Sequence, residues 1–351
     1  MATLHNALAR VEDPVIGDDI VSLGLVGDIE IDGDTAHVPL ALGAPHSPSE
    51  TRITEDVRAV VREAGYEPSL SVEIDDTTPA GQMDGAPNVI AVSSGKGGVG
   101  KSTVAVNLAT AMAERGANVG LFDADVYGPN IPRMLGVQDK PGRAEDDETI
   151  IPIESHGLKL MSIGFLVGED DPVIWRGAMV NKVLTELLHD TEWGDLDYFV
   201  VDLPPGTGDV QLTLLQQMGV LGALAVTTPQ DISLDNARKG VRMFEKHDTS
   251  MLGVVENMSG FVCDECGTRH DVFATGGGQR LADEFELPLL AEVPLDPAIQ
   301  QSCEVGEPTV SDGVSEPARA FRKLAERTMD QVGRERRRSH ADGAADIDLT
   351  P

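Results

Sequence analysis

From Asn88 onward, short and nearly continuous apolar runs alternate with helical patterns. Strands that lack a polar face are buried on both sides, which is typical of a parallel sheet between two layers of helices. The pattern therefore predicts an α/β domain with a mostly parallel sheet, in which ligands bind at the carboxyl ends of the strands. The runs are Val89–Val92, Val119–Phe122, Leu158–Ile163, Tyr198–Val201, Gly222–Val226, Met251–Val255 and Leu289–Val293.

Residues 1–76 show a different pattern, which predicts a separate small α/β domain. Its elements are a helix from Leu4 to Arg10, strands at 21–26 and 28–42 broken by Asp32-Gly33, a helix at 49–64 and a strand at 70–74. Residues 77–87 have linker composition, residues 88–335 form the large domain, and the small, acidic residues 336–351 are expected to be disordered. The large domain ends in a helix from Pro317 to about Arg338, whose apolar stripe favours docking on a core over membrane binding. The stripe is Phe321, Leu324, Ala325, Met329 and Val332.

A glycine-rich segment between the first apolar run of the large domain and a helical pattern has the sequence of a phosphate-binding loop. It reads Gly95-Lys96-Gly97-Gly98-Val99-Gly100-Lys101-Ser102-Thr103. Glycines let backbone N–H groups surround phosphates, Lys101 supplies a charge, and the Ser102 hydroxyl can hold Mg²⁺. Lys96 adds a second cation near a transferred phosphoryl group, where charge develops during reaction.

Acidic residues follow two of the other apolar runs, in Asp123-Ala124-Asp125 and at Asp202. A carboxylate at the tip of a buried strand is costly unless it meets a cation or a hydrogen-bond donor, so we expect Asp202 to hold Mg²⁺ through water. The loops 126–130 and 203–209 are expected to respond to the γ-phosphate. For either acid alone, a helix cap or turn is the alternative.

The chain has three cysteines, two of them spaced Cys263-x-x-Cys266. A closed metal site needs four ligands, so either a second subunit supplies two more or His270 and another group complete a zinc site. A redox dithiol is disfavoured because no clear helix follows the pair. Cys303 is expected to be a buried packing residue. So few cysteines favour a reducing, cytoplasmic compartment.

The formal net charge is −32, from 59 acidic and 27 basic residues. Molar salt reduces the Debye length to about 3 Å and removes most of the resulting repulsion, so the composition predicts a salt-adapted, halophilic cytosol. Nucleic-acid binding is disfavoured because it needs clustered Lys and Arg. The sequence has no apolar run of about 18 residues and begins without a secretory pattern. We therefore expect no membrane span and no secretion.

Taken together, these motifs resemble those of the Mrp/ApbC iron–sulfur cluster carrier ATPases, relatives of the MinD and ParA ATPases. The likeness covers Asn88 to about Arg327, and residues 1–76 resemble the small domain of SufT-type assembly factors. Related small domains commonly carry a cysteine in the loop that here reads 43–48 and contains His46, so docking or regulation is expected instead of cluster handling. The motifs are the two-lysine loop, 123–129, Trp175-Arg176-Gly177, 202–209, Asn257-Met258-Ser259 and Cys263-x-x-Cys266.

The resemblance implies a homodimer that hydrolyses ATP. In it, Lys96 reaches the nucleotide of the other subunit, Asp125 positions the attacking water and Asn257 contacts adenine. Cys263 and Cys266 of both subunits hold one bridging 4Fe-4S cluster, which is passed to client apoproteins. The alternatives are a MinD- or ParA-like positioning ATPase with a structural zinc site, and a metal scaffold whose nucleotide is only structural. No role follows from the sequence for Trp175-Arg176-Gly177.

Overall fold

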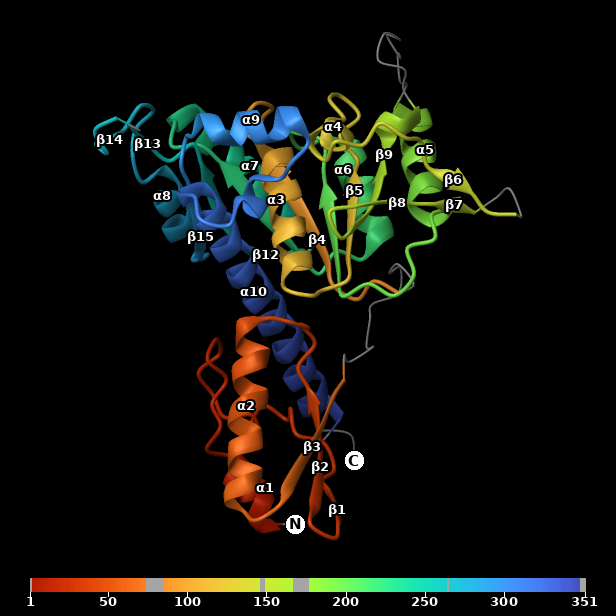
Figure 1. Ribbon diagram of the computed structural model, residues 1–351, viewed down its shortest axis with the longest axis vertical. Helices are drawn as coiled ribbons and strands as arrows, with labels where there is room; N and C mark the ends of the chain where they lie inside the picture. Colours follow the sequence, from red (N-terminus) through yellow and green to blue (C-terminus); the bar gives the residue numbers. More distant parts are fainter. Residues whose placement is uncertain (1, 74–84, 146–148, 167–176, 264, 348–351) are drawn as a thin grey trace. The chain divides into compact units, whose positions relative to one another are not determined.

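The computed structural model describes residues 2–73, 85–145, 149–166, 177–263 and 265–347, which are shown in Figure 1. The chain divides into two compact units. The first unit combines residues 1–78 with 326–351, and the second unit contains residues 79–325. Each unit has a sheet of its own.

The second unit is built on an eight-stranded sheet. Neighbouring strands are parallel except for the edge strand β8, which runs antiparallel to β9. Every residue of β4, β5, β10 and β11 is buried, so these strands need no polar face. The expected mostly parallel α/β fold is confirmed. The strand order is β15 (Leu289–Val293), β12 (Ser250–Asn257), β11 (Gly222–Thr227), β4 (Val89–Ser94), β10 (Tyr198–Asp202), β5 (Val119–Asp123), β9 (Leu158–Ser162) and β8 (Ile153–Ser155).

Helices cover both faces of this sheet. The connection through α3 (Lys101–Glu114) crosses the sheet in the opposite direction from the connections through α5, α6, α7 and α8. Because such connections are right-handed, α3 lies on one face, in front of the strands in Figure 1, and the other four lie on the opposite face. The remaining elements of the unit are α4 (Ile131–Met134), α5 (Gly177–His189), α6 (Asp209–Met218), α7 (Asp231–Lys246), α8 (Gly277–Glu284), α9 (Pro297–Val305), the short helices η1 (Ile163–Leu166) and η2 (Thr309–Asp312), and the short strands β6 (Gly142–Arg143), β7 (Ile150–Ile151), β13 (Phe261–Val262) and β14 (Arg269–His270).

The first unit has a three-stranded sheet in the order β1-β2-β3, antiparallel and then parallel. Its core includes Ile20, Leu40 and Ile53. The hairpin turn expected at Asp32-Gly33 is confirmed, and Gly33 has φ 59°. The strand expected at 21–26 is wrong, because that segment forms turns with a single bridge from Val26 to Leu40. The elements are α1 (Ala2–Leu8), β1 (Glu30–Asp32), β2 (Thr35–Ala41), α2 (Pro48–Glu63) and β3 (Glu67–Glu73).

The last helix, α10 (Glu316–Ile347), corrects two expectations. The disorder expected from Arg336 onward is wrong through Ile347, because the helix continues and buries Arg337 completely against Asp13 of the first unit. The expected domain end at 335 is also wrong, since residues from Glu326 onward belong to the first unit. The apolar stripe from Phe321 to Val332 is buried, as docking on a core requires.

Candidate functional site

The phosphate-binding loop connects β4 to α3, as the sequence predicts. Gly95 lies against the backbone of α7, where a side chain would collide with Asn236 and Ala237. Gly98 and Gly100 have φ near +80°, a conformation that glycine adopts without strain. Gly100 is the residue before α3, so the N–H groups at the start of this helix face the loop.

The loop borders a cavity of about 330 Å³ at the carboxyl edge of the sheet. Most of the loop residues expected to bind nucleotide line this cavity, together with Asp125 from the segment after β5. Tyr127, Asn130 and Pro205, from the loops expected to respond to the γ-phosphate, also line it. Met134 lines it as well, and the sequence did not single out this residue. Tyr127 is 80% exposed at the cavity, where it is available to a ligand or a second protein.

Lys101 is the electrostatic centre of the site. Its Nζ lies 2.7 Å from Asp202 Oδ1 and 3.3 Å from Asp125 Oδ2, and all three side chains are buried. Ser102 Oγ donates to the other oxygen of Asp202 at 2.5 Å. The structure therefore joins the loop to the tips of β5 and β10, as the sequence predicted.

Asp123, to which the sequence analysis assigned no role, holds the turn that carries Asp125. Its carboxylate accepts hydrogen bonds from Asp125 N at 3.2 Å, from Ile131 N at 3.3 Å and from Ser162 Oγ at 2.9 Å. These contacts fix the turn that carries Asp125. The position of Asp123 at the end of a buried strand could have indicated its role. Nothing in the sequence indicated that Ser162, on the neighbouring strand β9, would be its partner.

Burial and mutual repulsion shape the ionisation of these groups. Burial, followed by repulsion from Asp202, raises the pKa of Asp123 to about 7, although Ser162 and Lys101 oppose the shift. Burial also raises the pKa of Asp202, against the opposing effect of Lys101. Burial alone lowers the pKa of Lys101, but attraction to Asp202 and Asp125 outweighs it and the pKa is raised. Lys101 is thus the positive charge that this acidic site requires.

The oxygen atoms of Ser102 and Asp202 fit a magnesium site. They lie 2.5 Å apart beside the phosphate-binding loop, and hydroxyl, carboxylate, water and phosphate oxygens are the ligands that Mg²⁺ prefers. Mg²⁺ would neutralise Asp202 if Lys101 turned toward a phosphate group.

Asn257 lies at the end of β12 and contacts the loop instead of lining the cavity. Its Nδ2 donates to Val99 O at 2.8 Å, and the residue is 6% exposed. Lys96 is half-buried and lines the cavity. The adenine contact expected of Asn257 and the exchange between subunits expected of Lys96 remain predictions.

Cys263 and Cys266 lie apart from the nucleotide cavity, in a segment that we call the cysteine hairpin, Phe261–His270. Cys263 N donates to Thr268 O at 3.0 Å, and Gly267 N donates to Cys263 O at 2.8 Å. Cys263 is half-buried and Cys266 is exposed. Hydrogen bonds from Thr268, and then from Cys263, lower the pKa of the Cys266 thiol, which favours the thiolate form that binds metals.

The other expected metal features receive no support. Among the described residues, which omit Asp264, no group of three or more His, Cys, Asp or Glu side chains could hold a metal ion. The His270 ring stacks on Phe261 instead, with ring centroids 6.5 Å apart. The full burial expected of Cys303 is wrong, because the residue is half-buried beside Thr103, where partial burial raises the pKa of its thiol. Trp175 and Arg176 lie outside the described residues.

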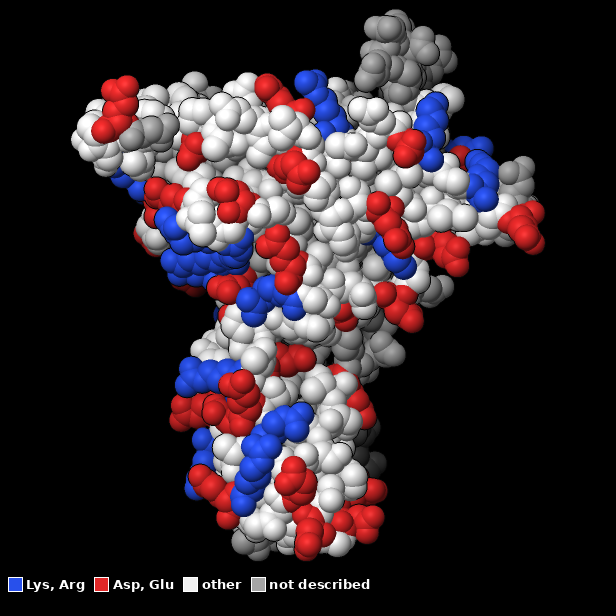
Figure 2. Space-filling view, viewed as in Figure 1, with Lys and Arg blue, Asp and Glu red and all other residues white. Residues whose placement is uncertain are grey.

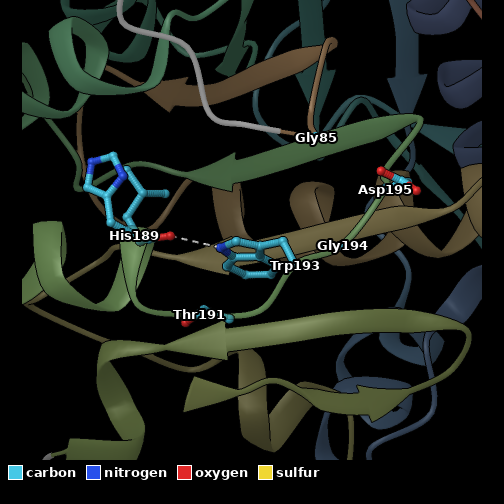
Figure 3. A pocket seen from close by; sticks show the side chains of 7 residues that line it. Gly85, His189, Thr191, Trp193, Gly194 and Asp195 are labelled. Carbon is cyan, nitrogen blue, oxygen red and sulfur yellow. Dashed lines mark hydrogen bonds between the residues drawn. The ribbon is translucent and has the colours of Figure 1, made fainter. Parts of the chain in front are cut away.

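A second cavity, of about 380 Å³, lies at the opposite edge of the sheet (Figure 3). Gly85, before β4, and Trp193, Gly194 and Asp195, before β10, border it. Trp193 Nε1 donates to Leu188 O at 2.9 Å and so has a partner within the protein. Ligands of parallel α/β sheets bind at the carboxyl edge, so we do not assign the nucleotide to this cavity.

Acidic side chains are spread over the face shown in Figure 2, with fewer basic side chains between them. On this face the negative charge is dispersed and is not gathered into a single patch. Within the described part of the chain, no helix is both long enough and apolar enough to cross a bilayer.

The fold and the loop define a nucleotide-binding P-loop NTPase of the α/β class. Two family models match the chain: "NUBPL iron-transfer P-loop NTPase" over residues 85–329 and "Iron-sulfur cluster assembly protein" over residues 2–74. The chain thus belongs to the NUBPL iron-transfer P-loop NTPase family, and the suspected relationship is confirmed.

Similar proteins agree with this assignment. Proteins named iron-sulfur cluster carrier protein from Haemophilus influenzae and Escherichia coli are each 42% identical to this chain, with 94% of this chain and 91% and 92% of the relatives covered. A nucleotide-binding protein from Archaeoglobus fulgidus in complex with ADP has a TM-score of 0.57 and 38% identity over 64% of this chain and 88% of its own. The cell division ATPase MinD from Pyrococcus furiosus has a TM-score of 0.51 and 26% identity over 68% and 97%.

Proposed function

We propose that this protein is an ATP-hydrolysing iron–sulfur cluster carrier that binds a 4Fe-4S cluster between two subunits and transfers it to client apoproteins. The observation that carries the proposal is that one chain has all the parts of a nucleotide site but only half of the ligands of a cluster site. The nucleotide site has its loop, its lysine and its metal-binding oxygens, whereas the exposed cysteine hairpin offers two of the four thiolates that a cluster needs. A second copy of the chain would supply the other two.

In the proposed reaction, the residues of the nucleotide site have separate roles. Lys101 leaves its two carboxylate partners and binds the phosphates, while Ser102 and Asp202 hold Mg²⁺, directly or through water. Asp125 orients the attacking water from the segment after β5. Lys96 adds positive charge where it develops on the transferred phosphoryl group, in the neighbouring subunit's site.

The surroundings of the cysteine hairpin suit a protein interface. Val272, which is 54% exposed, and Phe273, which is 36% exposed, lie two and three residues after the hairpin. Apolar side chains beside a half-complete ligand set favour a contact that buries both. The same surface would become accessible to a client when the subunits separate.

We assign a different role to the first unit, because the loop at 43–48 carries no thiol. We propose that it docks clients or regulates the carrier. We also propose that the protein works in a cytoplasm rich in salt, since dispersed acidic charge is tolerated best where salt screens it.

Anaerobic reconstitution with iron and sulfide tests the central proposal. Wild type should bind about four iron atoms per dimer, whereas Cys263→Ala and Cys266→Ala should lose the cluster and retain ATP binding. Cys303→Ala is the matched control and should keep its cluster. A full oxygen-sensitive cluster in either hairpin variant would refute the bridging site, and stoichiometric zinc in wild type would favour a structural zinc site.

A further inference from the structure

Asn257 joins the end of β12 to the phosphate-binding loop. Its Nδ2 donates to Val99 O at 2.8 Å, and its Oδ1 accepts from Met258 N at 3.0 Å. A side chain on Gly100 would collide with this carboxamide, so the contact depends on a glycine in the loop. The carboxamide of Asn257 is therefore bonded both to the loop and to the segment that leads to the cysteine hairpin.

That segment is short and closely held. Met258 has φ 58°, Ser259 N donates to Val293 O at 2.9 Å, and Leu295 N donates to Gly260 O at 2.8 Å. Three residues thus separate Asn257 from the first strand of the hairpin. A displacement of Asn257 can reach the hairpin without passing through a long flexible loop.

Arg269, on the returning strand β14, closes the base of the hairpin. Its Nη2 donates to Ser259 O at 2.9 Å and lies 3.4 Å from Ser259 Oγ. Gly260, with φ 76°, leaves room for the guanidinium, which a side chain there would displace. The next residue back, Thr268, accepts from Cys263 N at 3.0 Å. The contacts therefore run from Val99 to the cysteine pair through Asn257, Ser259 and Arg269.

We infer that Asn257 and Arg269 are positioning residues that transmit the state of the phosphate-binding loop to the cysteine pair. The carbonyl of Val99 and the N–H of Gly100 belong to one planar peptide group. A phosphate that attracts this N–H tilts the carbonyl that Asn257 holds. The inference rests on the proposed function for the identity of the cargo, but its contacts exist within a single cluster-free chain.

The test uses cluster-free protein under reducing conditions. Alkylation rates of Cys263 and Cys266 are read separately from peptide masses, with and without Mg²⁺ and a non-hydrolysable ATP analogue. In wild type we expect the nucleotide to change the rate at one or both thiols by about fivefold or more, the lower range of measured coupling between sites. For each thiol, the relevant quantity is the ratio of its alkylation rate with nucleotide to its rate without nucleotide. Arg269→Ala should bring this ratio close to one, and so should Asn257→Asp, which replaces the amide donor by an oxygen.

Arg280→Ala is the matched control, because Arg280 and Arg269 have equally exposed side chains, 51% each, and Arg280 also bonds a backbone carbonyl, that of Thr275. It should keep the wild-type ratio. Loosening of the hairpin alone would change the rates with and without nucleotide by the same factor, so their ratio would stay as in wild type. Arg269→Lys retains a donor and should restore part of the nucleotide response.

Arg269→Ala that binds the analogue normally and keeps the wild-type ratio would overturn the inference. So would a wild-type protein whose thiols do not respond to nucleotide. Neither result bears on the reconstitution experiment, which judges the proposed function by iron content.

Discussion

The ion pair between Arg337 and Asp13 should be decisive for the stability of the first unit. Both side chains are fully buried, and Asp13 also accepts from Val15 N at 2.8 Å and Ile16 N at 3.1 Å. Arg337→Met removes the cation and leaves a buried carboxylate with two backbone donors. We expect this substitution to destabilise the first unit and to leave the second unit unchanged.

The magnitude follows from the burial of the pair. Removal of one member of a buried pair typically costs about 3–5 kcal/mol, and the two backbone donors that remain on Asp13 place the expected loss near 3 kcal/mol. Asp13→Asn combined with Arg337→Met should recover most of the loss, because the unpaired charge is gone. Arg338→Met is the control, since Arg338 is exposed and its loss should cost less than about 0.5 kcal/mol.

The two units can be observed separately. Both tryptophans of the chain, at positions 175 and 193, belong to the second unit, so tryptophan fluorescence during urea unfolding reports that unit. Hydrogen exchange of peptides from β2 and β3 reports the first unit. The measurements belong in molar KCl, which screens surface pairs but not a buried one. Equal hydrogen-exchange protection of β2 and β3 in Arg337→Met and Arg338→Met would refute the reasoning. It would mean that the end of α10 does not stabilise the first unit.

Three further predictions concern the nucleotide site. Lys96→Ala, Lys101→Ala and Asp125→Asn should each slow steady-state ATP hydrolysis by at least about tenfold, and an unchanged rate in Asp125→Asn would remove that residue from the mechanism. Asp123 binds its proton more tightly when folded, since its pKa rises from 3.8 to about 7. The wild-type protein therefore loses stability as the pH rises from about 4 to about 7. Over that pH window, the free energy of unfolding of Asp123→Asn should rise relative to that of wild type by at most about 4 kcal/mol, measured by urea unfolding without nucleotide. Chelation of Mg²⁺ by EDTA should weaken ATP binding, measured calorimetrically, by at least about tenfold in wild type and much less in Ser102→Ala.

The sequence was most informative where function depends on local order along the chain. The phosphate-binding loop is one continuous segment between a strand and a helix. Asp202 ends the buried strand β10, and Asp125 lies two residues after the end of the buried strand β5. Because the carboxyl ends of parallel strands meet at one edge, predicting the strands was enough to bring these residues together. The same reasoning could have included Asp123, which ends β5.

Long-range pairing was not visible in the same way. The run Arg334–Arg338 precedes an acidic end and has the composition of a solvated segment, but one of its arginines is buried against a residue 324 positions earlier in the chain. Composition cannot identify such a partner. The segment at 21–26 was mistaken for a strand because its apolar residues alternate, whereas Asp19 caps a turn there through Val21 N and Ser22 N.

The charges of the nucleotide site explain why metal and nucleotide should enter together. In the described structure, Lys101 lies within 3.3 Å of Asp125 and 2.7 Å of Asp202. A nucleotide that draws Lys101 to its phosphates would leave these buried carboxylates facing a second set of negative charges, which is strongly unfavourable away from water. Mg²⁺ held by Ser102 and Asp202 would supply the charge that Lys101 gives up. An exchange of partners by Lys101 would give the site two distinct states that a carrier could use as a switch.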